Sequence, residues 1–187
     1  MTPSENELVA LARAGDTQAF DELVALHQER VFALAYRITG NRDDAADAQQ
    51  ETFVRAWRSL GRYRGDAALS TWLHRITVNV CLSRRGRSRP FETYEELRLE
   101  QSAASGDVDP VADCVTRADT ASVIRKVLGG MPAHYRVLLA LREIEGRPFD
   151  EIARILGCSV ESARVRASKA RRMLRERLEP LVREDEL

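Results

Sequence analysis

Apolar residues recur at helical spacing on both sides of a central stretch that has no such pattern. Before it they are Phe20, Leu23, Val24, Val31, Leu34, Ala35 and Ile38, and after it Val115, Ala118, Ile124, Val127 and Leu128. Between them, residues 90–110 are rich in Glu, Ser, Ala, Gly and Asp. A period near 3.6 residues indicates helices with one buried face, and a polar stretch without periodicity indicates a linker. We therefore predict an all-α protein with two small helical domains, residues 1–89 and 111–187, joined by a flexible acidic linker at 90–110.

Glycine and polar residues mark the expected ends of helices in the first domain. The pattern predicts one helix from Ala19 to Ile38, ended by Gly40, and a second from about Asp43 to Leu60. The segment Gly61–Leu69 contains two glycines and no periodicity, which indicates a loop. Ser70 is expected to cap the helix that follows the loop.

The formal net charge of zero conceals blocks of opposite sign. Residues 1–50 hold 4 basic and 9 acidic side chains, residues 51–90 hold 9 and 2, residues 91–120 hold 2 and 8, and residues 121–187 hold 14 and 10. Because salt screens charge over about 10 Å, a DNA strand responds to the local block and not to the total. The sequence therefore predicts two basic DNA-binding regions separated by an acidic connector.

Residues 41–89 offer two surfaces of different character. The first third carries Asp43, Asp44 and Asp47, whereas the charge from Arg55 onward is almost wholly basic. The aromatic residues interleaved with these arginines are Trp57, Tyr63 and Trp72. An acidic helix face suits a basic protein partner, and arginines beside aromatic rings suit a single nucleic-acid strand. Together they indicate a protein that binds a larger protein assembly and contacts opened, single-stranded DNA.

The second domain contains a helix-turn-helix pattern. A helix from Pro132 to about Ile144 is followed by a helix over Phe149–Leu156, a turn over Gly157–Ser159 and a basic helix over Val160–Leu178. The apolar stripe expected on the last helix is Val160, Ala163, Ala167, Ala170, Leu174 and Leu178. The face expected to point outward is Glu161, Ser162, Val165, Ser168, Lys169 and Arg172, with Arg164 at its edge. Such a helix, about 10–12 Å across, fits the major groove of duplex DNA.

Two passages resemble the extracytoplasmic-function (ECF) sigma factors of bacterial RNA polymerase. Residues 43–53 read DDAADAQQETF and residues 71–79 read TWLHRITVN, similar to the family's second region. Residues 131–178, which begin MPAHYRVLLALREIEG, resemble its fourth region. The resemblance implies that the first domain binds core polymerase and recognises and melts the minus-ten element. It implies that the second domain reads the minus-thirty-five element as duplex, and that the linker threads through basic channels of the polymerase.

The same resemblance implies two sets of binding residues. The polymerase-binding residues are Asp43, Asp44, Asp47, Gln50 and Glu51. The DNA-binding residues are Arg62, Tyr63, Arg64, Arg75, Asn79, Arg84, Arg85, Arg164, Val165, Ser168, Lys169 and Arg172. The Gly61–Leu69 loop is expected to capture an unstacked base of the non-template strand, and Arg75 and Asn79, four residues apart, to contact that strand. Phosphate contacts without sequence preference are expected from Arg84, Arg85, Arg87 and Arg89.

Catalysis, a cofactor, metal binding and membrane insertion are not expected. The three histidines, His27, His74 and His134, lack clustered acids or cysteines, and His27 is interpreted as a buried, hydrogen-bonded side chain. The three cysteines, Cys81, Cys114 and Cys158, form no CxxC pair, which favours a reducing cytoplasm. No apolar run approaches the roughly 20 residues of a membrane helix, and the N-terminus does not look like a signal peptide.

Two rival functions stay open on the residues alone. A free-standing helix-turn-helix regulator needs the basic last helix but has no use for the acidic-then-basic order of residues 43–89. A helical adaptor that touches no DNA needs neither basic block. The resemblance favours the sigma factor, and it also implies an anti-sigma protein as a partner.

Overall fold

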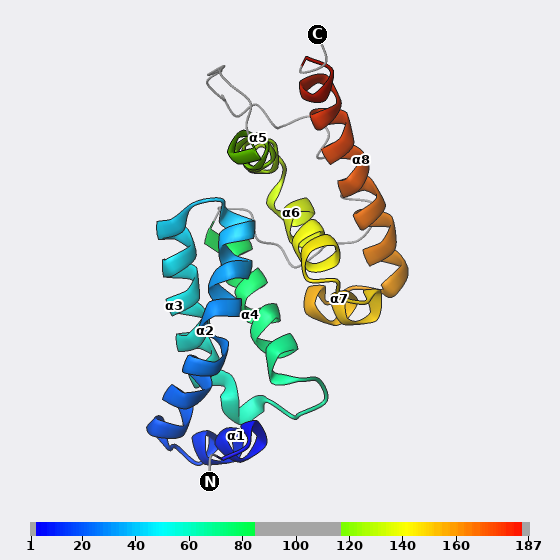
Figure 1. Cartoon of the computed structure of the whole chain (residues 1–187). Coiled ribbons are helices and arrows are strands. Elements are labelled where there is room, and N and C mark those ends of the chain that lie inside the picture. The colour runs from blue at the N-terminus through cyan, green and yellow to red at the C-terminus, as the bar shows by residue number, and fades with distance from the viewer. Residues whose placement is uncertain (1–2, 85–116, 185–187) are drawn as a thin grey trace. The chain divides into compact units, whose positions relative to one another are not determined.

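The computed structural model describes residues 3–84 and 117–184, and every regular element in these ranges is a helix. The chain divides into two compact units, Met1–Ser88 and Arg89–Leu187. The prediction of an all-α protein is confirmed (Figure 1). The linker predicted at 90–110 lies outside the described residues, as do Arg85, Arg87, Arg89 and Cys114.

The first unit is a bundle built around one long central helix. Its elements are α1 (Glu5–Arg13), α2 (Thr17–Thr39), α3 (Arg42–Ser59), η1 (Leu60–Arg62) and α4 (Leu69–Arg84). Helix α2 packs against α1, α3 and α4, and α3 also packs against α4 (Figure 1). The buried core includes Leu8, Leu23, Val31, Leu34, Phe53, Ala56 and Leu73. This packing leaves one side of α3 and one narrow strip of α4 to face solvent.

The junction between α2 and α3 sets the direction of the acidic helix. Gly40, at a φ of +72°, ends α2 in the left-handed conformation that glycine adopts without strain. Asn41 then begins α3, because its side-chain oxygen accepts hydrogen bonds from the backbone amides of Asp43 at 2.8 Å and Asp44 at 3.1 Å. Both helix boundaries agree with the prediction to within two residues.

Helix α4 differs from its prediction in two ways. The expected cap at Ser70 is wrong, because the helix begins at Leu69 and the amides of Thr71 and Trp72 already donate to the carbonyl of Ala68. Leu69 is buried in the core, which anchors the start of the helix two residues earlier than a cap at Ser70 would place it. The buried face is also wider than the stripe of Trp72, Leu73, Ile76 and Val80 that the helical spacing predicts, since α4 packs against both α2 and α3. Its additional buried residues are Thr71, His74, Thr77, Val78 and Cys81.

The second unit is a helix-turn-helix supported by two preceding helices. Its elements are α5 (Arg117–Gly129), α6 (Ala133–Leu139), the π-helical turn η4 (Ala140–Ile144), α7 (Phe149–Leu156) and α8 (Val160–Glu184). Helix α8 packs against α5, α6 and α7. Ala163, Ala167 and Ala170 are buried as predicted, and their small side chains let α8 lie close to its neighbours.

Two predictions for α8 need correction. Val160 was expected in the buried stripe but is 36% exposed, because it is the first residue of the helix and lies at the edge of the contact. The helix was expected to end at Leu178 but continues to Glu184 through Pro180. In this exposed stretch water can bind the carbonyl of Glu176, which has lost its amide donor to the proline.

The histidine and cysteine predictions can be followed in the structure. His27 is 4% exposed, and its Nε2 atom lies 3.1 Å from Oε2 of Glu5, so the interpretation as a buried, hydrogen-bonded histidine is confirmed. Cys81 is buried and Cys158 half-buried, and neither forms a disulfide with another described residue. Within the described ranges, no three metal-ligating side chains cluster. No helix among the described residues has the length and hydropathy that crossing a bilayer requires.

Candidate functional site

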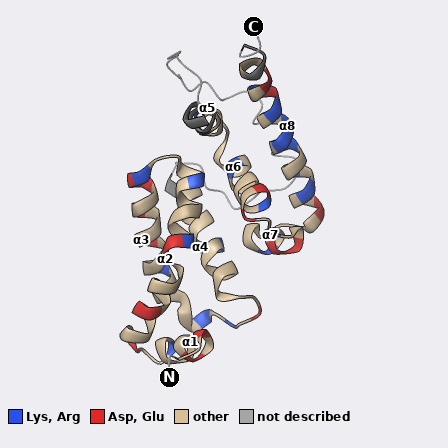
Figure 2. Ribbon diagram, viewed as in Figure 1, with Lys and Arg blue, Asp and Glu red and all other residues tan. Residues whose placement is uncertain are grey.

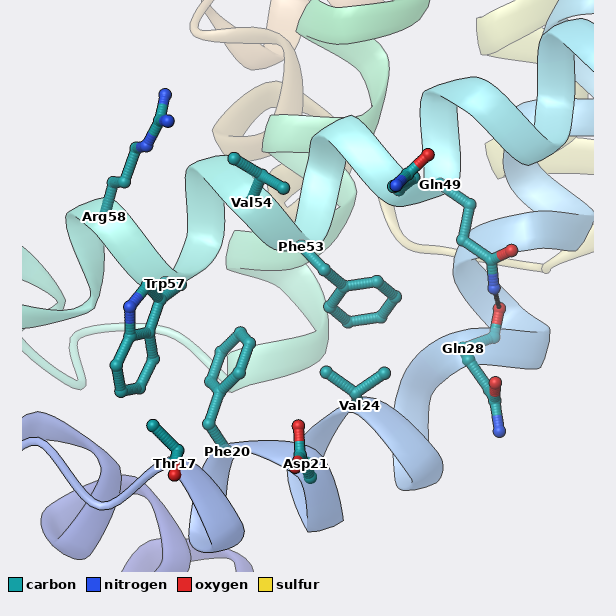
Figure 3. A pocket seen from close by; sticks show the side chains of 11 residues that line it. Thr17, Phe20, Asp21, Val24, Gln28, Gln49, Phe53, Val54, Trp57 and Arg58 are labelled. Atoms are coloured by element: carbon teal, nitrogen blue, oxygen red, sulfur yellow. Dashed lines mark hydrogen bonds between the residues drawn. The ribbon is translucent and has the colours of Figure 1, made fainter.

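An open groove of about 580 Å³ runs between α2 and α3 of the first unit. Phe20 and Val24 of α2 face Phe53 and Trp57 of α3 across it (Figure 3). The rings of Phe20 and Trp57 lie 4.9 Å apart between centroids, yet Trp57 stays 37% exposed. At one end, the side-chain amide of Gln49 donates to the carbonyl of Gln28 at 2.8 Å and ties the two helices together (Figure 3). Exposed apolar side chains in a groove of this kind are typical of a surface that binds a partner helix.

The predicted polymerase-binding residues continue directly into this groove. Asp43, Asp47 and Gln50 are exposed and recur every three or four residues along α3, and Val54 and Trp57 follow at the same spacing. Gln50 itself lines the groove. The face therefore begins with carboxylates near the start of α3 and becomes apolar toward its end. Such a surface matches a partner that is basic at one end and apolar at the other.

The other two residues of that set lie beside this face. Asp44 is exposed in the first turn of α3, where a negative charge complements the helix dipole. Glu51 accepts a hydrogen bond of 2.6 Å from Nε of Arg55 on the next turn, and both side chains are partly exposed. Because the pair is exposed, we expect its contribution to stability to be small and Glu51 to remain available to a partner.

The loop between η1 and α4 is held in place by Tyr63. The Tyr63 hydroxyl donates to the carbonyl of Ala67 at 2.6 Å, and its ring lies 5.2 Å from that of Trp72. Burial raises the pKa of Tyr63, and the charges of Glu5 and Asp66 raise it further, so the hydroxyl remains a donor. The structure thus places Tyr63 as the anchor of the loop. The arginines that flank it, Arg62 and Arg64, are exposed.

A second cavity of about 350 Å³ lies between this loop and helix α1. Glu5, Asn6 and Arg13 line it from α1, and Tyr63 and Arg64 line it from the loop. We did not predict α1 or its residues from the sequence. A signal was present, because Ser4 and Glu7 form a capping box, in which the Glu7 carboxylate accepts from the Ser4 amide at 2.7 Å.

Helix α4 exposes a narrow polar strip that contains both predicted strand contacts. Arg75 and Asn79 are exposed, one turn apart, on a helix that is otherwise largely buried. Ser83 continues the strip, and its hydroxyl donates to the carbonyl of Asn79 at 2.7 Å. The backbone of Arg84 ends the described part of α4, whereas its side chain and Arg85 lie outside the described residues.

The outward face of α8 carries the predicted duplex contacts. Gly157, at a φ of +66°, ends α7, and the Ser159 hydroxyl accepts from the amide of Ser162 at 3.1 Å to begin α8. Arg164, Ser168 and Arg172 are exposed, and Val165 and Lys169 are half-buried. Figure 2 shows Lys and Arg positions, in blue, along much of the α8 ribbon. Two basic residues of this unit face the interior instead, since Arg136 is 2% and Arg166 4% exposed.

These features define a helical DNA-binding protein of the transcription machinery, and comparison with known proteins identifies the family. Residues 23–91 match the family model Sigma-70 region 2, and residues 122–174 match Sigma-70, region 4. The RNA polymerase sigma-H factor of Pseudomonas aeruginosa is 34% identical over 186 residues, 96% of each chain. The ECF RNA polymerase sigma factor SigM of Mycobacterium tuberculosis is 35% identical over 171 residues, 91% of this chain and 83% of SigM.

Solved structures agree with this identification. CnrH in complex with the cytosolic domain of CnrY is 29% identical, with a TM-score of 0.62 over 94% of this chain and 97% of CnrH. The sigma factor RpoE of Bartonella quintana, solved with the anti-sigma factor NepR, shares the fold at 23% identity and a TM-score of 0.62, over 86% of this chain and 96% of RpoE.

The chain belongs to the ECF RNA polymerase sigma factors. It binds core RNA polymerase and promoter DNA and directs promoter-specific initiation of transcription. It is an initiation factor and not an enzyme. The match of residues 23–91 to region 2 disfavours the free-standing regulator, which has no need of that region.

Proposed function

We propose that the two units divide the work of initiation between a single strand and a duplex. The first unit, within residues 1–89, docks on core polymerase and holds the opened minus-ten element. The second unit, within residues 111–187, reads the minus-thirty-five element. The observation that supports this division is that the first unit has two separate surfaces. One is the groove between α2 and α3, and the other is the strip of exposed polar residues on α4.

The docking face on α3 is suited to the clamp helices of RNA polymerase, which bind this helix in the family. Asp43, Asp44 and Asp47 attract a basic partner, while Trp57 and Val54 supply the apolar contacts that dominate interface affinity. Gln50 and Glu51 lie between these two parts. We assign the docking site to the acidic residues together with the groove.

The cavity beside the Tyr63 loop is suited to an unstacked base of the non-template strand. Its volume of about 350 Å³ accommodates a nucleobase. Arg64 lines the cavity and the exposed Arg62 directly precedes the lining residue Tyr63 in the chain, so both are suited to pair with phosphates. Arg75 and Asn79 supply donors and acceptors to the same strand, and Arg84, Arg85, Arg87 and Arg89 stay predicted as phosphate contacts. We include Asn6 as a contact to the base, because its side chain lines the cavity with a donor and an acceptor.

An anti-sigma protein and a cytoplasmic location complete the proposal. CnrH was solved with the cytosolic domain of CnrY bound, and the groove on α2 and α3 is an exposed surface that such a partner could cover. Binding there would compete with core polymerase. Cys81 and Cys158 form no disulfide among the described residues, which is consistent with a reducing compartment.

The reading of the upstream element can be tested at Lys169. We expect Lys169→Ala to weaken promoter binding by the holoenzyme by about 1–3 kcal/mol and to relax base preference at one position of the minus-thirty-five element. The measurement is the dissociation constant for a set of promoters that differ at single base pairs. Lys126→Ala, an exposed lysine on α5, is the control and should leave that preference unchanged. An equal loss for every promoter would instead make Lys169 a phosphate contact.

A further inference from the structure

We propose that Phe149 is a positioning residue, which holds the guanidinium of Arg164 in place for contact with promoter DNA. The inference rests on the proposed role of α8 in reading the duplex and adds a residue that does not itself touch DNA. Three observations support it: the contacts of the Phe149 ring, the way that ring is anchored, and the charge environment of Arg164.

Two arginines from different elements contact the Phe149 ring. The guanidinium carbon of Arg142, in η4, lies 4.8 Å from the ring centroid, and that of Arg164, in α8, lies 5.9 Å from it. Both distances fall within the roughly 6 Å over which a cation is attracted to an aromatic face. Phe149 is the half-buried first residue of α7, so one ring links η4, α7 and the DNA-facing helix.

The ring rests on a turn that is fixed by several polar contacts. Arg142 donates from its guanidinium to the carbonyl of Arg147 at 2.8 Å, which holds Arg142 against the ring. Arg147 in turn pairs with Glu145 at 2.8 Å and with Glu151. These three side chains are 14%, 16% and 21% exposed, so the contacts are more sheltered than ordinary surface pairs. The Phe149 ring is therefore a fixed support for Arg164.

Arg164 differs from nearby exposed arginines in the kind of partner it has. Arg154 pairs with Asp150 at 2.6 Å, Arg171 with Glu143 at 2.7 Å, and Arg172 lies 3.7 Å from Glu176. For Arg164, no ion pair is found among the described residues, and its neighbour is the Phe149 ring. A carboxylate partly neutralises an arginine, whereas a ring restrains it and leaves its charge and N–H donors available. Arg164 is thus ordered before DNA arrives, which lowers the entropy cost of the contact.

A double-mutant cycle tests the coupling between the two residues. The holoenzyme is assembled with wild type, Phe149→Leu, Arg164→Ala or both, and its dissociation constant is measured for a promoter fragment that the wild-type holoenzyme selects from a random library. We expect Phe149→Leu to weaken binding about two- to fivefold in the wild-type background and to have no further effect in the Arg164→Ala background. Phe149→Tyr, which keeps the ring, should retain wild-type affinity.

Controls separate this role from a purely structural one. Phe149→Leu and Lys169→Ala should act additively, because Lys169 lies five residues beyond Arg164 on α8 and so outside the i+3 and i+4 positions that neighbour Arg164. An equal loss from Phe149→Leu with and without Arg164 would overturn the proposal, as would a lack of effect from Arg164→Ala alone. In both cases, if the wild-type holoenzyme still selects promoters, the proposed role of α8 in reading duplex DNA is retained. A wild-type holoenzyme that selects no promoter would remove that function and this inference together.

Discussion

Replacing Trp57 with alanine is expected to lower the affinity of the chain for core RNA polymerase by about 2 kcal/mol or more, which is roughly 30-fold. Trp57 is 37% exposed at the mouth of the groove between α2 and α3, and its ring rests on Phe20 (Figure 3). Partly exposed tryptophans that are already supported by a neighbour are frequent hot spots, because a partner buries them at little cost in conformational freedom. The affinity is measured by titrating labelled chain with core polymerase.

Two further variants make this result specific to the groove. Leu26→Ala removes a side chain that is 57% exposed on α2 but does not line the groove, and it should change the affinity by no more than about 0.5 kcal/mol. Val54→Lys changes a groove residue that is 38% exposed, and it should weaken binding without disturbing the core. Equal losses from Trp57→Ala and Leu26→Ala, or no loss from Val54→Lys, would show that the polymerase docks elsewhere.

The combined change Arg75→Ala and Asn79→Ala is expected to reduce the fraction of opened promoters by about tenfold or more, while closed complexes form at nearly wild-type affinity. The two side chains are exposed on one strip of α4, and neither contributes to the core. Each lost polar contact with a single strand costs on the order of 1 kcal/mol, and contacts of an arginine with a phosphate cost more.

Promoter opening is measured by the permanganate reactivity of promoter thymines. Closed-complex formation is measured by the binding of the holoenzyme to promoter DNA at low temperature. Arg30→Ala, an exposed arginine on α2, provides a control of equal charge change and should open promoters normally. Unchanged thymine reactivity in the double variant would remove Arg75 and Asn79 from the strand contact.

Local signals in the sequence predicted most of the architecture. Gly40 and Asn41 end one helix and begin the next, and Gly157 and Ser159 do the same within the helix-turn-helix. These residues act through backbone conformation and capping hydrogen bonds, which depend on a few neighbouring residues only. The alanine stripe of α8 was also readable, because its period of 3.6 residues is a property of the helix itself.

Tertiary packing determined the features that the sequence did not reveal. The apolar side chains of Val54 and Trp57 remain exposed only because α2 and α3 leave a groove at that level. Arg136 and Arg166 are buried although each carries a charge, since their positions on α6 and α8 face the interior of the unit. The cavity beside the loop required α1, which the sequence marks only locally, by the capping box of Ser4 and Glu7. A periodic pattern identifies a helix but not how many neighbours cover it.

Photo-crosslinking from both units within one holoenzyme most directly tests the proposed division of labour. The probe is placed at Ser83 on the exposed strip of α4 or at Glu161 near the start of α8, because both are exposed and neither is assigned a DNA contact. We expect the Ser83 probe to react with the non-template strand near the minus-ten element, and only after opening. The Glu161 probe should react with duplex near the minus-thirty-five element before and after opening. Crosslinks from both probes to the same DNA segment, or equal reaction of the Ser83 probe with closed complexes, would contradict the account.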